Sequence, residues 1–141
     1  MSGAFAIRSL AALVLVVAVA PIPTGVAAGR RFEAVSPKLV GTWTRDVSSV
    51  DVKRAGAHAA AAGVWTLEIE KDGTAAVFDA SGAGSFEGSI SSLAANRVRV
   101  KADTPSAIYS WHVANRRLTF IKVKDSIPDR AAVFSGTWKH K

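Results

Sequence analysis

Apolar and polar residues alternate with a period of two through most of residues 39–138. In the clearest run, residues 97–101, valines alternate with cations, and residues 63–70 show the same alternation. Successive side chains of a β-strand point to opposite faces, so this period is typical of half-buried strands. Short turn-rich segments separate the runs, and no strand–helix–strand rhythm is present. The pattern therefore predicts eight antiparallel strands, of which the last spans residues 130–138.

Two turn signals predict how neighbouring strands pair. Asp72-Gly73 is the strongest hairpin signal in the chain, and a two-residue loop there pairs Ile69 with Ala76 and Leu67 with Phe78. The second signal is residues 115–116, Asn-Arg. A two-residue loop at that point pairs Trp111 with Phe120 and Val113 with Leu118, which brings aromatic residues together.

One helix is predicted, over residues 49–62. Ser48 can cap its first turn, and Asp51 stands three residues later as the capping-box partner. Alanine favours the helix, and Gly63 is a plausible stop, although Gly56 lies in the middle.

The segment Gly41-Thr42-Trp43 is echoed near the end of the chain by Gly136-Thr137-Trp138. We expect these segments to lie in the first and last strands and to meet, which closes the sheet and removes its exposed edges. The predicted fold class is all-β: an eight-stranded antiparallel up-and-down barrel, with one short helix between strands 1 and 2, preceded by a signal peptide.

The Gly41-x-Trp43 motif, the helix after it and the hairpins up to residues 130–138 resemble the calycins, and within them bacterial lipocalin-like proteins. The resemblance covers most of residues 39–141. It implies a small β-barrel that binds a ligand inside. The opening Leu39-Val40-Gly41-Thr42-Trp43 is also similar to that of the avidins.

The first 28 residues have the features of a signal peptide. A short segment ending at Arg8 precedes an apolar run, prolines break that run, and Val26-Ala27-Ala28 places small residues before Gly29. The alternative is an uncleaved membrane anchor. We expect a signal peptide at residues 1–28, a flexible leader at 29–38 and a lipocalin-like barrel at 39–141. The protein would then be secreted, and the absence of cysteine excludes disulfides and thiol chemistry.

Strand direction sorts the predicted inward residues between the two ends of the barrel. Trp43 and Trp138 fall at one end, which should be packed and dry. The other end collects cations and aromatic residues that could hold the anionic head of a small, partly apolar ligand: Arg45, Trp65, Phe78, Phe86, Tyr109 and Lys122. The alternative is a barrel filled by its own side chains.

The formal charge is +7. Arg97, Arg99 and Lys101 form a basic stripe on the outward face of one predicted strand. The competing hypothesis is therefore a packed structural or adhesion module that binds anionic polymers or surfaces through this stripe; nucleic acid is not an expected partner of an exported protein. We expect a monomer and predict no catalytic site, metal site or cofactor, since the three histidines lack metal-like spacing.

Overall fold

The computed structural model describes residues 35–82 and 85–141, and this part of the chain contains eight strands and three short helices. The strands are β1 (Gly41–Val47), β2 (Gly63–Ile69), β3 (Thr74–Asp79), β4 (Ser85–Leu93), β5 (Arg97–Lys101), β6 (Ala107–Ala114), β7 (Arg117–Lys124) and β8 (Gly136–His140). The helices are α1 (Ser49–Ala55), the 3₁₀ helix η2 (Ala59–Ala61) and α2 (Pro128–Phe134). The predicted signal peptide and residues 29–34 lie outside the described residues.

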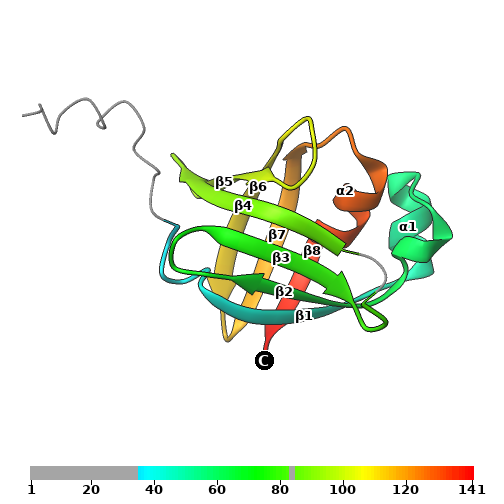
Figure 1. Cartoon of the computed structure of the whole chain (residues 1–141), viewed down its shortest axis with the longest axis horizontal. Coiled ribbons are helices and arrows are strands. Elements are labelled where there is room, and N and C mark those ends of the chain that lie inside the picture. Colours follow the sequence, from blue (N-terminus) through cyan, green and yellow to red (C-terminus); the bar gives the residue numbers. More distant parts are fainter. Residues whose placement is uncertain (1–34, 83–84) are drawn as a thin grey trace, which may run out of the picture. The chain divides into compact units, whose positions relative to one another are not determined.

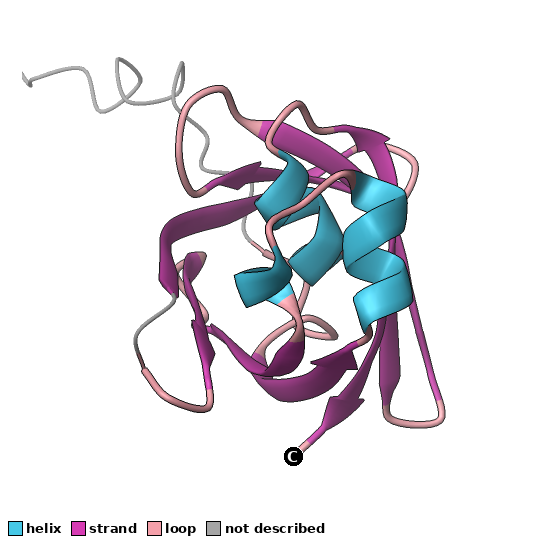
Figure 2. Cartoon of the chain, turned by 90° about the vertical axis from the view of Figure 1, so that its right-hand side faces the viewer, coloured by secondary structure: helices cyan, strands magenta, loops and turns pink. Residues whose placement is uncertain are grey.

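Each strand pairs antiparallel with its neighbours along the chain, and β8 pairs with β1, so the sheet closes into a barrel (Figure 1). Trp43 lies opposite His140 at this closure, and Thr44 lies opposite Lys139. The predicted eight-stranded antiparallel barrel, with a short helix between β1 and β2, is confirmed, whereas the structure does not test the signal peptide. The three helices lie across one opening of the ring of strands (Figure 2), which we call the helix end.

Residues just before β1 pack onto the barrel. Val35 and Leu39 are buried, and the Ser36 backbone N–H donates to Ser92 Oγ at 3.2 Å. The last part of the predicted leader is thus attached to the fold in the described structure.

A Gly-x-Trp motif occurs three times, on the adjacent strands β1, β2 and β8. Gly41, Gly63 and Gly136 have φ values of 138°, 120° and 132°, a region that favours glycine. Each following tryptophan donates its indole N–H to the carbonyl four residues earlier: Trp43 to Leu39, Trp65 to Ala61 and Trp138 to Phe134, at 2.9, 2.9 and 3.1 Å. The glycine of each motif therefore begins a strand, and the tryptophan bonds that strand to the segment before it.

Helix α1 is shorter than predicted. Its capping box is confirmed, because the Ser48 side chain accepts from the Asp51 N–H and the Asp51 side chain accepts from the Ser48 N–H. The helix ends at Ala55, however, because Gly56 adopts a left-handed conformation, with a φ of 69°, and its N–H closes the last turn. The remaining alanines form η2 instead of continuing the helix to residue 62.

The predicted register of β2 and β3 is wrong by one residue. Leu67 lies opposite Val77, not Phe78, and Ile69 lies opposite Ala75, not Ala76. The cause is a three-residue loop in which Gly73 takes a φ of 89°. Since a shift of one residue exchanges the two faces of a strand, Val77 points inward and Phe78 points outward. The other hairpin is confirmed: Trp111 lies opposite Phe120 over a two-residue turn.

Helix α2 replaces the first half of the predicted last strand. Pro128 stands in the first turn, where a proline costs no hydrogen bond, and the alanines that follow favour a helix. Residues 131–134 are all apolar and buried, so no polar residue among them marks the helical period. This helix lies at the helix end, which is the end where the candidate ligand-binding residues were predicted.

Candidate functional site

Five of the six predicted ligand-binding residues lie at the helix end, but α2 fills the space between them. The Phe134 ring lies 5.7 Å from the Tyr109 ring and 6.2 Å from the Phe120 ring, between centroids. The sixth residue, Phe78, is on the outer face because of the register described above. The sequence therefore predicted which residues converge, but not the helix that occupies their centre.

Arg45 holds α2 in place. Its Nη1 donates to the carbonyl oxygens of Ala132 and Val133 at 3.0 and 2.6 Å, and its Nη2 contacts Asp51 Oδ2 at 3.3 Å. Burial lowers the pKa of the guanidinium, and the Asp51 carboxylate opposes that shift. Gly136 lies directly against this guanidinium, and a Cβ there would come within 2.5 Å of it. The cation predicted to bind a ligand thus joins α1, α2 and β8.

Tyr109 belongs to a buried cluster with Asp125 and Arg130, which we call the clasp. The Tyr109 hydroxyl donates to Asp125, and Arg130 forms a bidentate pair with the same carboxylate at 3.0 and 2.7 Å. Arg130 also donates to the carbonyls of Ala102, Asp103 and Pro105. These bonds fasten the β5–β6 loop to α2.

Burial and hydrogen bonding fix the protonation states in the clasp. Burial alone would raise the pKa of Asp125, but hydrogen bonds from Arg130 and Tyr109 outweigh it and hold the pKa below its usual value. Burial and the bond to Asp125 together raise the pKa of Tyr109. The clasp therefore contains one carboxylate, one guanidinium and one neutral phenol, each with a partner.

Two open clefts flank α2. The larger, of about 440 Å³, is lined by the exposed Lys122 and Arg54, by Asp51 and by apolar residues that include Phe120 and Ala132. We call it the α1–α2 cleft. The smaller, of about 170 Å³, is lined by Trp65 and Phe86, whose ring centroids are 6.1 Å apart. The predicted mouth is thus divided, with the cations on one side of α2 and two aromatic residues on the other.

The outer wall of the barrel is divided by charge. Strands β1–β4 contain four acidic residues and one Lys or Arg, the buried Arg45. Strands β5–β8 contain seven Lys or Arg and no Asp or Glu. We call the outward cations of β5–β8 the basic wall: Arg97, Arg99, Lys101, Arg117 and Lys139.

The cations of the basic wall form no salt bridges with acidic side chains in the described part of the chain. Within residues 35–82 and 85–141, none of its five cations lies within 4.0 Å of a carboxylate oxygen. Arg97, Lys101, Arg117 and Lys139 are exposed, and Arg99 is half-buried. The predicted stripe on β5 is therefore one part of a wider basic surface, which a strand-by-strand count of charges in the sequence would have found.

Comparison of the chain with known protein families, characterised proteins and solved structures gave no match. The closed eight-stranded antiparallel barrel is compatible with a lipocalin-like fold. In the part of the chain that the structure describes, no helix is long and apolar enough to cross a membrane.

Proposed function

We propose that this is an exported, non-catalytic binding protein that attaches to an anionic polymer or surface through the basic wall. The observation that carries the proposal is the accumulation of unneutralised cations on β5–β8, beside strands with the opposite charge balance. A rigid sheet holds these cations at fixed spacings, and a surface of one sign attracts polyions of the other sign. The packed helix end supports this function over ligand binding inside the barrel.

Membership in the lipocalin-like calycins forms part of the proposal. It is supported by Gly41-x-Trp43 at the start of β1, the short helix after that strand and the up-and-down order of the strands. In this barrel the outer wall, instead of the interior, would make the functional contact.

Heparin retention tests the polyanion proposal. Replacing Arg97, Arg99 and Lys101 together with glutamine is expected to abolish most of the retention. The triple substitution should also make retention depend less on salt, because each contact that is lost lowers the number of counterions released on binding by one. For wild type, retention on heparin should fall as the salt concentration rises.

A matched control removes the same charge from elsewhere. Lys53, Arg54 and Lys71 are exposed and lie outside the basic wall. Their triple glutamine variant should keep the wild-type salt dependence. Equal losses in the two triple variants would show that net charge, and not the basic wall, governs binding, and would overturn the proposal.

The α1–α2 cleft favours a second candidate function, the binding of a small, partly apolar anion. Its apolar lining residues suit a short alkyl chain, and Lys122 stands where a carboxylate could reach it. Octanoate should therefore bind more tightly than octanol in calorimetric titrations. Lys122→Gln should weaken octanoate about two- to fivefold, since exposed charge pairs contribute about 0.2–1 kcal/mol.

Lys124 provides the control for this candidate. It is exposed on the same strand but does not line the cleft, so Lys124→Gln should leave octanoate binding unchanged. Ala55→Phe should block the cleft and abolish binding of both compounds. Undiminished binding to Ala55→Phe would place the ligand elsewhere.

A further inference from the structure

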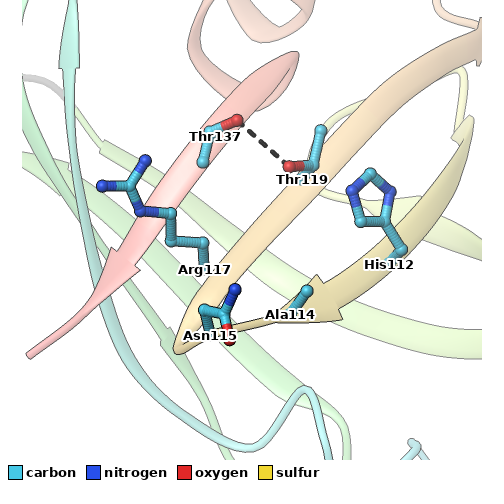
Figure 3. Close-up of a pocket in the computed structure, with 6 residues that line it drawn as sticks. All are labelled: His112, Ala114, Asn115, Arg117, Thr119 and Thr137. Carbon is cyan, nitrogen blue, oxygen red and sulfur yellow. Dashed lines mark hydrogen bonds between the residues drawn. The ribbon is translucent and has the colours of Figure 1, made fainter.

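The basic wall contains a hollow of about 490 Å³ on the outer side of β6, β7 and β8. Six residues line it: His112, Ala114, Asn115, Arg117, Thr119 and Thr137 (Figure 3). None of the six is acidic, and all of them except Ala114 have a side-chain group that can donate a hydrogen bond to an anion. We call this feature the wall hollow.

The strand register holds the lining of the wall hollow in place. His112 lies opposite Thr119, and Thr119 lies opposite Thr137, so these three form one row across the sheet. Arg117 lies in the next outward row, opposite Lys139. The tight turn at residues 115–116, with φ values of 50° and 58°, fixes the end of the β6–β7 hairpin beside them. The register therefore places the lining side chains in fixed rows on the outer face of the sheet.

The two threonines give the wall hollow a specific donor. Their hydroxyl oxygens are 3.0 Å apart, as the dashed line in Figure 3 shows. Each hydroxyl has one hydrogen, and one of the two is used between them. The second hydrogen stays free to donate outward into the wall hollow, which Asn115 and Arg117 also line. A cluster of donors without a carboxylate accepts an anion and excludes a cation.

We propose that the wall hollow binds one sulfate or phosphate ester group of the anionic polymer. This inference rests on the proposed function and specifies its ligand. A tetrahedral ester group presents three terminal oxygens in different directions, which matches donors arriving from β7, β8 and the β6–β7 turn. A carboxylate presents two oxygens in one plane and leaves part of the donor set unused. Arg117 and Lys139 on the next row supply the positive charge.

The proposal is tested by NMR titration with methyl sulfate, methyl phosphate and acetate. Both ester anions should shift the amide signals of residues 112–119 and 137, and acetate should do so more weakly. The double variant Thr119→Val/Thr137→Val keeps shape and charge but removes both hydroxyls. It should bind the ester anions about tenfold more weakly, as expected for the loss of a hydrogen bond to a charged group. Lys71→Gln, which removes an exposed charge outside the basic wall, should leave the titration unchanged.

Polymer binding separates this proposal from the proposed function. N- and O-desulfated heparin retains its carboxylates but has less charge, so both proteins should bind it more weakly than heparin. Wild type should lose more affinity than Thr119→Val/Thr137→Val, because only wild type also loses contacts from the two hydroxyls to the ester groups. If the double variant still prefers sulfated heparin as wild type does, the wall hollow is not the ester site, although the basic wall still binds the polymer. Ester shifts confined to the hollow without any heparin binding would keep the site and overturn the proposed function.

Discussion

Replacing Arg130 with alanine is expected to destabilise the fold by about 3–5 kcal/mol, since removal of one partner leaves the other charge buried and unpaired. Arg130 and the Asp125 side chain are both fully buried in the clasp. The substitution also leaves the carbonyls of Ala102, Asp103 and Pro105 without their donor. Urea unfolding monitored by tryptophan fluorescence measures the loss.

A double variant controls for the unpaired charge. Asp125→Leu/Arg130→Met removes both charges and should recover part of the stability, but not the part owed to the three carbonyls. Because the folded-state pKa of Asp125 lies below its unfolded value, its contribution is complete above the unfolded pKa. It is lost as pH falls through the folded one. Wild type should therefore lose more stability on acidification than the double variant. Equal stability of wild type and Arg130→Ala would contradict the clasp.

Truncating Trp43 or Trp138 to alanine is also expected to cost about 3–5 kcal/mol, as for other large aromatic residues in a core. Their exposed fractions are 2% and 0%. Each also ties a preceding segment to its strand through the indole N–H. The same unfolding measurement applies, and a loss below about 1 kcal/mol would mean that neither packing nor the tie matters there.

Trp111 offers a matched comparison for the indole bond. Its buried Nε1 has no hydrogen-bond partner among the described residues. Trp43→Phe should therefore lose about 1 kcal/mol more than Trp111→Phe, because only the first substitution breaks a hydrogen bond. Similar losses in both would show that the bond from Trp43 to Leu39 contributes little.

Alternation predicted the barrel because half-buried strands need one apolar face, as Val98 and Val100 show. It could not predict the β2–β3 register, because a loop of two or three residues depends on the backbone angles at Gly73. The turn at residues 115–116 was a weaker signal, because Arg116 and not glycine follows Asn115, but the facing of Trp111 and Phe120 favoured the register that the structure has. The third Gly-x-Trp copy, at Gly63, is visible in the sequence once the first and last are aligned.

The candidate site was harder to predict than the fold. Residues 131–134 are all apolar, so they lack the polar positions by which an amphipathic helix shows its period. Without α2, Arg45 and Tyr109 look like ligand-binding groups, whereas in the structure α2 and the clasp satisfy them. Asp125 lies in the loop before α2, and Arg130 lies in α2 itself. Their pairing therefore depends on the helix, which brings the Arg130 guanidinium to the Asp125 carboxylate.

The division of charge around the barrel gives the wall an electric dipole moment directed across its axis, from β1–β4 towards β5–β8. Near a polyanion such a dipole experiences a torque, so the molecule turns its basic side forward before contact. Once attached, it presents an acidic outer side to the solvent. A second molecule that approaches this side meets the same sign of charge that the polymer offered to the first, so the first molecule would orient the second in the same way.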